Sequence, residues 1–168
     1  EKAWRVDLVA TPVMVGVGWQ AAIRSIQFAS SQDAGMTWTA AQQVDRGVGV
    51  TTAERVVLAA SGATVYAAWS DNRRGAFRFD FYLNRSEDAG LTWLNSDVRI
   101  NAADIQNTYS DYVAFELDSG VLHAAWEDAD SILYNQSSDG GQTWLATDRR
   151  LDLGVGFGPP FMGPAISV

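Results

Sequence analysis

The sequence contains no cysteine, a single histidine and no long apolar run. The lack of cysteine excludes disulfide bonds, thiolate metal sites and cysteine nucleophiles together. A membrane-spanning helix needs about 18 apolar residues in a row, and no segment approaches that length, so a membrane is not an expected partner. The chain starts at Glu1. A secreted or periplasmic location, with any leader already removed, is the expectation for its compartment.

Positive charge is scarce as well. Twelve Lys and Arg residues stand against 20 Asp and Glu residues, which gives a net charge of −8. Such a chain repels a phosphate backbone, and its longest basic clusters are only the pairs Arg73-Arg74 and Arg149-Arg150, so nucleic acid is not an expected partner. Hydrophobic residues make up 47% of the sequence. This composition is typical of a folded chain, and 168 residues fit one domain spanning 1–168.

Three segments repeat the pattern Ser-x-Asp-x-Gly-x-Thr-Trp without a mismatch, and we call each of them a box. The fixed positions are filled by Ser31, Asp33, Gly35, Thr37 and Trp38, by Ser86, Asp88, Gly90, Thr92 and Trp93, and by Ser137, Asp139, Gly141, Thr143 and Trp144. The three aspartates are 55 and 51 residues apart. One four-stranded propeller blade occupies roughly 40 to 50 residues. The repeat therefore predicts three copies of one structural unit.

A second set of tryptophans supports this register. Trp19, Trp69 and Trp126 each end an alternating apolar run that precedes a box, as expected for the second strand of each unit. No segment has a convincing helical period. The expected fold is all-β, with three four-stranded blades that make up half of a six-bladed propeller. The predicted blades span about residues 4–48, 54–102 and 111–153.

Each box is expected to form the hairpin between the third and fourth strands of its blade. The aspartate accepts hydrogen bonds from N–H groups of its own turn, the glycine supplies a positive φ, and the hydroxyls satisfy remaining backbone groups. The box tryptophan is then expected to be buried at the start of the fourth strand. This interpretation makes Asp33, Asp88 and Asp139 structural rather than catalytic.

The three boxes resemble the Asp boxes, or BNR repeats, of the sialidase superfamily. The Trp-ended strands, such as Val65 to Asp71, are similar to the strand before the box in those proteins, so the resemblance covers nearly the whole chain. It implies a sialidase-like β-propeller. It implies no single activity, because the superfamily includes sialidases and other glycoside hydrolases, carbohydrate-binding propellers, photosystem assembly factors and sorting receptors.

Three blades do not close a ring, since propellers typically have about four to eight. An open arc would leave the flat apolar faces of its end blades in water. Residues 158–168 are expected to include the first strand of a further blade. Either the chain is a piece of a longer propeller, or it pairs with a second copy to give six blades. We favour the homodimer, because an isolated arc is not expected to remain soluble and closed cyclic symmetry makes such a pair natural.

Ligands of propellers normally meet the face opposite the box hairpins. Polar residues of the loops expected there are candidates for binding a glycan or a protein: Arg24, Asp71, Asn72, Arg73, Arg74, Tyr109, Glu127 and Asp128. The arginine pair is of the kind that holds a carboxylate or sugar hydroxyls. Glu127, Asp128 and Asp130 offer the oxygen ligands that calcium takes, although we expect an acidic loop in an acidic chain to be solvated. No metal site and no cofactor are predicted.

The sialidase resemblance also implies a catalytic pattern, which this sequence matches little. That pattern has three arginines around the substrate carboxylate, a tyrosine paired with a glutamate as nucleophile, an aspartate acid/base, and an Arg-Ile-Pro motif near the first inner strand. Arg5 is followed by valine and then by Asp7 where the proline should stand, and Arg55 matches the motif equally well. No catalytic residue is therefore predicted.

His123 lies in a strand pattern, and we expect it to be packed rather than to act as a base. The sequence favours a non-catalytic, sialidase-like propeller module that presents a loop face to a glycan or a protein and is completed by self-association. A fragment or divergent member of the glycoside hydrolases, acting on terminal sugars, is the alternative hypothesis. A purely structural repeat array is the third.

Overall fold

The computed structural model describes residues 4–21, 24–47, 52–75, 79–104, 113–128 and 131–152. Every regular element in these ranges is a β-strand, and none of them holds a helix that could cross a membrane. The strand expected within 158–168 lies outside the described residues, and so do Tyr109 and Asp130.

The strands form three four-stranded antiparallel sheets, and in each sheet the order along the chain is also the order in space. Blade 1 consists of β1 (Trp4–Thr11), β2 (Met14–Gln20), β3 (Ile26–Ser31) and β4 (Gln42–Gln43). Blade 2 consists of β5 (Ala53–Ser61), β6 (Thr64–Asp71), β7 (Asp80–Ser86) and β8 (Val98–Arg99). Blade 3 consists of β9 (Val113–Asp118), β10 (Val121–Asp128), β11 (Ser131–Ser137) and β12 (Arg149–Arg150). The predicted all-β fold with three four-stranded blades is confirmed.

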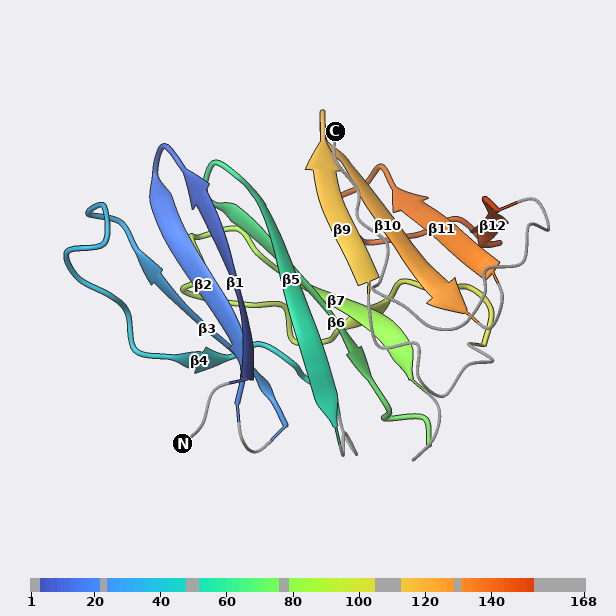
Figure 1. Ribbon diagram of the computed structural model, residues 1–168. Coiled ribbons are helices and arrows are strands. Elements are labelled where there is room, and N and C mark those ends of the chain that lie inside the picture. The colour runs from blue at the N-terminus through green and yellow to red at the C-terminus, as the bar shows by residue number, and fades with distance from the viewer. Residues whose placement is uncertain are drawn as a thin grey trace.

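The first strands of the three sheets lie at the centre of the molecule. β1 contacts β5, β5 contacts β9, and Figure 1 shows these three strands in a row, with the outer strands of blade 1 to the left and those of blade 3 to the right. Each blade thus has a front face toward the preceding blade and a back face toward the following one. The box hairpins lie at one end of the blades, the box face. The loops between second and third strands and the connections between blades lie at the other end, the loop face.

Strand pairing shows which residues are equivalent in the three blades. Each box serine pairs with an apolar residue of the second strand, Ser31 with Val15, Ser86 with Val65 and Ser137 with Leu122. Counted from these pairs, the equivalent position in the second strand of each blade is filled by a tryptophan, Trp19, Trp69 and Trp126, as predicted. The inner strands supply two further equivalent sets, Val6, Val56 and Val113, and Leu8, Leu58 and Phe115.

The apolar cores lie between the blades. At the first junction, Phe28 from the back of blade 1 packs edge-on against Trp93 from the front of blade 2, with ring centroids 5.2 Å apart. At the second junction, Phe81 packs against Trp126 at 5.5 Å. Strand β6 contributes side chains to both cores, because successive side chains of a strand point to opposite faces of the sheet. Trp69 belongs to the first core for this reason.

The front face of blade 1 carries the same apolar residues, but no sheet of the described chain covers it. Val6 is 68% exposed and Leu8 is 59% exposed, whereas their equivalents in the other two blades are at most 8% exposed. Trp38 is 46% exposed, although Trp93 is only 7% exposed. The prediction that every box tryptophan is buried is therefore wrong for Trp38. A box tryptophan is not covered by its own hairpin. It is covered by the third strand of the preceding blade, as Phe28 of β3 covers Trp93.

No sheet of the described residues covers the back face of blade 3 either. Leu151 is 52% exposed, whereas its equivalents Val44 and Ile100 are 0% and 1% exposed. His123 lies on this face, half-buried, with its Nδ1 atom 2.7 Å from the hydroxyl of Tyr134.

Candidate functional site

Each box folds into a turn that is held by its own side chains. In blade 2 the Asp88 carboxylate accepts hydrogen bonds from the Ser86 hydroxyl at 2.7 Å, the Thr92 N–H at 2.8 Å and the Thr92 hydroxyl at 2.6 Å. The Ser86 oxygen in turn accepts the Gly90 N–H at 2.8 Å. The other two boxes form the same four bonds at 2.6 to 2.9 Å. The three box glycines have φ values of +88°, +84° and +82°.

These bonds keep the box carboxylates ionised. The hydroxyl of the box threonine is the main cause, and it lowers the pKa of Asp33 to about 2 and that of Asp139 to about 2. Burial raises the pKa of Asp88, but the hydrogen bonds from the threonine and serine of its box outweigh burial, and the net shift is downward. A general acid or base works best with a pKa near the working pH. The pKa values of Asp33 and Asp139 are far from that range, and the pKa of Asp88 is shifted in the same direction, which supports the structural interpretation.

The box glycines have a second use where a blade precedes them. A Cβ atom at Gly90 would overlap the ring of Phe28 from blade 1, and one at Gly141 would overlap the side chain of Leu83 from blade 2. We call the surface formed by a box glycine and its box tryptophan the seat, because the third strand of the preceding blade rests on it. At Gly35 a Cβ atom would meet no described atom within 4 Å. The seat of blade 1 is therefore not covered by the described chain.

A polar clasp reinforces the junction between blades 1 and 2. The Asn84 amide donates to the backbone carbonyl of Val44 at 3.2 Å and to the carboxylate of Asp97 at 2.8 Å. Asp97 also accepts the backbone N–H of Arg46, in the connection that leaves blade 1, at 2.8 Å. Asn84 and Asp97 thus hold the last strand of the preceding blade through its backbone.

The clasp recurs at the next junction and is missing at the front of blade 1. Asn135 donates to the Ile100 carbonyl at 3.2 Å and to Asp148 at 2.7 Å. The positions equivalent to this asparagine and aspartate in blade 1 are Ala29 and Ala41, which have no hydrogen-bonding side chain. Whatever covers the front of blade 1 is therefore not held by this clasp.

Arg73, a predicted ligand-binding residue, pairs with carboxylates of its own blade. Its Nε atom lies 2.9 and 3.0 Å from the two oxygens of Asp71, and its Nη2 atom donates to Asp97 at 2.8 Å. The guanidinium lies 3.7 Å from the centre of the Tyr82 ring. Both carboxylate side chains are 0% exposed. Arg73 therefore balances two buried negative charges, each of which would be costly without a partner.

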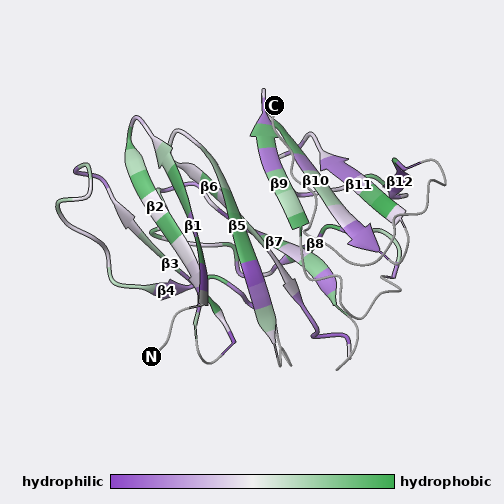
Figure 2. Cartoon of the chain, in the orientation of Figure 1, coloured by the Kyte–Doolittle hydropathy of each residue, from purple (hydrophilic) through white to green (hydrophobic). Residues whose placement is uncertain are grey.

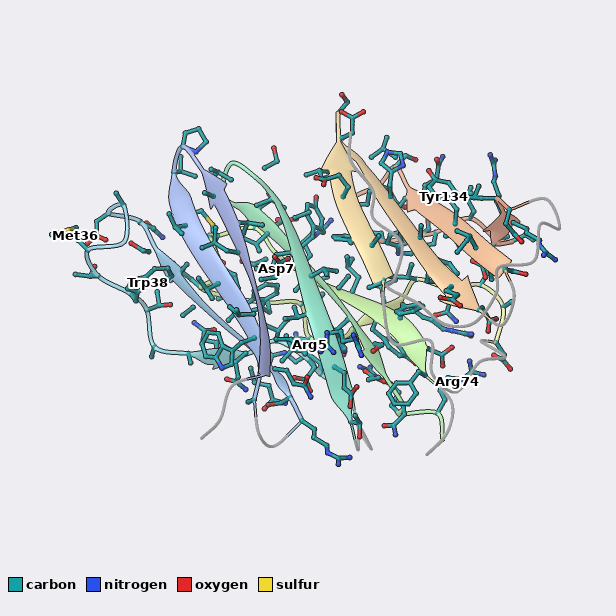
Figure 3. The ribbon with its side chains drawn as sticks, in the orientation of Figure 1. Arg5, Asp7, Met36, Trp38, Arg74 and Tyr134 are labelled. Atoms are coloured by element: carbon teal, nitrogen blue, oxygen red, sulfur yellow. The ribbon has the colours of Figure 1, made fainter. Side chains whose placement is uncertain are left out.

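Arg74, the second residue of the predicted pair, lies at the loop face (Figure 3) and is also in ion pairs. It contacts Asp80 at 3.3 Å and Asp104 at 2.7 Å, and Arg99 contacts the same two carboxylates at 2.8 and 3.1 Å. The hydrogen bond with Asp104 raises the pKa of Arg74. The pattern of the sequence did not reveal these partners, which lie 6 and 30 residues away. Ligand binding by the Arg73-Arg74 pair stays a prediction.

The structure spreads the other predicted binding residues over the loop face. Arg24 donates from Nη1 to the Thr52 hydroxyl at 2.6 Å. Asn72 and Asp128 are buried, and Glu127 is half-buried. In the part of the chain that the structure describes, no group of three or more His, Cys, Asp or Glu residues is placed to hold a metal ion.

A cavity of about 220 Å³ opens between the inner strands at the loop face. It is lined by β1, β5 and β9 through Arg5, Val6, Asp7, Arg55, Val56, Val57 and Val113. Figure 3 shows Arg5 between β1 and β5, toward their loop-face ends. In Figure 2 the hydrophilic part of β1 and β5 lies at the same ends. The cavity is thus central, on the face expected to meet ligands.

The same backbone irregularity positions both arginines of this cavity. The pairing register shifts between Trp4 and Val6 in β1 and between Glu54 and Val57 in β5. Arg5 and Arg55 have positive φ values of 50° and 58°. A left-handed conformation costs a residue other than glycine about 1–3 kcal/mol and is often found at functional sites. A bulge also re-aims its side chain. The same bulge occurs in two blades, which indicates that it specifically orients the two arginine side chains.

Among the described residues that line the cavity, Asp7 supplies the remaining charge, and each of its two carboxylate oxygens accepts a hydrogen bond from the backbone. Its Oδ1 atom accepts the Leu8 N–H at 2.9 Å, and its Oδ2 atom accepts the Leu58 N–H of the next blade at 2.7 Å. Sequence reasoning considered Arg5 and Arg55 as rival matches to one motif. It did not place them at one cavity, although the Arg-Val pair near the start of both inner strands was a usable signal.

No protein-family model matches the chain, and no curated protein matches its sequence. Solved structures do match. An α-L-arabinanase of Penicillium chrysogenum, complexed with arabinobiose, is similar with a TM-score of 0.61 at 18% identity, over 93% of this chain and 52% of its own. The arabinanase Arb43A of Bacillus subtilis gives a TM-score of 0.58 at 13% identity, over 89% and 59%. The NanB sialidase of Streptococcus pneumoniae gives 0.48 at 19% identity, over 79% and 20%.

The arabinanase matches define the class of this protein by its fold. The chain has a β-propeller fold of the kind found in glycoside hydrolases, and it spans about half the length of the two arabinanases it matches. Within that class it is a run of three blades with Ser-x-Asp-x-Gly-x-Thr-Trp turns. The sialidase match is too weak in fold similarity to distinguish one group of propellers from another. The closer relationship to Asp-box sialidases therefore stays a prediction.

Proposed function

We propose that this chain is a non-catalytic glycan-binding module that takes an acidic sugar at the cavity between its inner strands. The observation that carries the proposal is the pair Arg5 and Arg55, which stand in equivalent strained bulges and line one cavity. A guanidinium presents a planar fork of N–H donors that matches a carboxylate. In a chain of net charge −8, two arginines at one cavity give it a local positive charge that suits an anion.

The size and walls of the cavity favour a single sugar residue. Pockets for drug-sized ligands usually measure about 300–1,000 Å³. This cavity measures about 220 Å³, and four valines line it beside the charged residues. The valines offer an apolar wall to the C–H face of a sugar ring, and the arginines offer donors to its carboxylate. The fold shared with two arabinanases supports a sugar rather than a peptide as the ligand.

We propose that the module is non-catalytic because its cavity lacks the pair of available carboxyl groups that hydrolysis of a sugar linkage needs, among the residues that the structure describes. Most glycoside hydrolases need two carboxyl groups flanking the scissile bond. In the described lining of the cavity only Asp7 has one, and both of its oxygens accept backbone N–H groups that hold β1 to β5. We further propose that the module works as a self-associated pair of chains. Hydrolysis of terminal sugars remains the second candidate, because the matched structures include enzymes named as arabinanases.

Titration calorimetry with N-acetylneuraminic acid, and with its neutral carboxamide as control, tests the binding. The variants Arg5→Lys and Arg55→Lys keep the charge and lose the fork. A hydrogen bond to a charged group contributes about 1.5–3 kcal/mol, so each variant is expected to bind about 10–100-fold more weakly. Arg149→Lys, on the exposed strand β12, is the matched control and should bind as the parent does.

The same variants separate the two candidate functions. Equal binding of the acid and the carboxamide, or unchanged binding by Arg5→Lys and Arg55→Lys, would refute the assignment of the cavity. Fluorogenic sialosides and arabinosides report on hydrolysis. Turnover by the parent chain that disappears in both cavity variants would replace the binding module with an enzyme.

A further inference from the structure

We infer that Asp7 sets the charge selectivity of the cavity between the inner strands, so that the cavity favours a singly charged carboxylate over a doubly charged phosphate ester. This inference rests on the proposed function, because it takes the ligand to be an acidic sugar held by Arg5 and Arg55. It adds a specificity-determining residue to that site. Its basis is a fixed carboxylate in the lining of a cavity whose arginines suit an anion.

The acid at residue 7 is not a requirement of the blade. Asp7 pairs with Gly18 in blade 1, and the residues at the equivalent register in blades 2 and 3 are Val57 and Ala114. Val57 also follows a bulge and lines the same cavity. An apolar residue therefore suffices at this position of an inner strand. Of the three described blades, only blade 1 places an acid there, and it does so at the cavity.

Hydrogen bonds from two strands hold the Asp7 carboxylate in place. The Leu8 N–H of β1 donates to its Oδ1 atom at 2.9 Å, and the Leu58 N–H of β5 donates to its Oδ2 atom at 2.7 Å. An ionised carboxylate is an acceptor only, and both of these partners are donors. Asp7 therefore presents a negative charge at a fixed place between the two strands that carry the arginines.

This charge lies in the same small space as the charges of the arginines. Figure 3 shows Arg5 and Asp7 between β1 and β5, with Asp7 nearer the middle of the strands. Arg5, Asp7 and Arg55 line one cavity of about 220 Å³. An anion that occupies the cavity is therefore attracted by two side chains and repelled by a third at short range.

The repulsion affects a doubly charged ligand more than a singly charged one. The energy between two charges is proportional to their product, so a ligand of charge −2 is repelled by Asp7 twice as strongly as a ligand of charge −1 at the same place. Removal of the Asp7 charge should therefore strengthen the binding of a dianion by the square of the factor for a monoanion. A structural effect on the cavity changes both affinities alike, so the ratio of the two affinities reports the charge alone.

Titration calorimetry at pH 8 with glucuronic acid and glucose 6-phosphate tests the inference. The two sugars share a ring and carry the acid at C6, and the phosphate ester is a dianion at this pH because its second pKa is about 6. The parent chain should bind glucuronic acid more tightly. Asp7→Asn removes the charge and should shift the ratio of the two affinities about tenfold toward glucose 6-phosphate. Asp7→Val copies the residue at the equivalent position of blade 2 and should give the same shift.

Three control variants separate the charge of Asp7 from its structural role. Asp7→Glu keeps the charge and should keep the selectivity of the parent. Thr11→Val removes another hydrogen bond between blades 1 and 2, from the Thr11 hydroxyl to the Gly62 carbonyl at 2.9 Å, and should leave the ratio unchanged. Glu87→Gln removes a charge from a side chain that is 71% exposed in the blade 2 box, so it measures the effect of net charge. A near-ultraviolet circular dichroism spectrum like that of the parent shows that each variant is folded.

Three results would overturn the inference. They are a parent chain that prefers glucose 6-phosphate, folded Asp7→Asn and Asp7→Val variants with the same ratio of affinities as the parent, and a Glu87→Gln variant that shifts the ratio as much as they do. The outcome for the proposed function is distinct. A parent that binds neither glucuronic acid nor N-acetylneuraminic acid refutes the sugar site and this inference with it. A parent that binds them, with an unchanged ratio in the uncharged variants, refutes only the role of Asp7.

Discussion

The three box glycines provide a direct measurement of what a blade junction contributes to stability. They share a turn conformation, with φ between +82° and +88°, and they differ in their surroundings. Gly35→Ala introduces backbone strain of about 1–3 kcal/mol and no clash with the described residues. Gly90→Ala introduces the same strain and also drives a methyl group into the ring of Phe28. Overpacking of a core costs about 1–3 kcal/mol more.

Urea unfolding followed by tryptophan fluorescence measures this difference, with the free energy of unfolding obtained by linear extrapolation. Both substitutions are made in the same parent chain and unfolded at the same low protein concentration, so that association between copies contributes equally to both. Gly90→Ala should lower the free energy of unfolding by about 1–3 kcal/mol more than Gly35→Ala does. Gly141→Ala should fall between them, because the flexible end of Leu83 can move aside more easily than a ring. Equal losses of unfolding free energy for Gly35→Ala and Gly90→Ala would show that the box glycine is needed only for the turn. That result would refute the role of the seat in packing the preceding blade.

Three further outcomes follow from the contacts of single side chains. Arg73→Ala leaves two buried carboxylates without their partner and should lower the free energy of unfolding by about 3–5 kcal/mol in urea, whereas the half-exposed Arg150→Ala should change it by less than about 1 kcal/mol. Asp88→Ala removes the acceptor of three hydrogen bonds and should cost about 1–3 kcal/mol, so a melting temperature equal to that of the parent would contradict the role of the box. The folded pKa values of Asp33 and Asp139, about 2, lie below the ordinary 3.8, so the stability that these ionised groups give is complete above pH 3.8 and is lost as the pH falls toward 2. A melting temperature that does not change over that interval would exclude this contribution.

Sequence alone could predict the features that each blade carries within itself. The strand order, the three boxes and the matching tryptophans are local, because a turn aspartate finds its partners within four residues. The uncovered Trp38 shows where this reasoning ends. The three boxes have identical fixed residues, but burial of the box tryptophan depends on a neighbouring sheet that the box does not encode.

The candidate site depends on contacts between distant segments. Asp97 meets Arg73 across 24 residues and the backbone of Arg46 across 51. Arg5 and Arg55 meet at one cavity only because the inner strands of successive blades lie side by side. Sequence reasoning therefore identified the arginine pair that forms ion pairs and did not identify the arginines that line the cavity.

Equilibrium sedimentation of the unaltered chain tests the proposed self-association most directly, because it measures the mass of the native species. Across a micromolar to millimolar concentration series, the account predicts a reversible change from 18.2 kDa to twice that mass and no larger species. A single species of 18.2 kDa throughout, or a mass that keeps rising without reaching a limit, would contradict it.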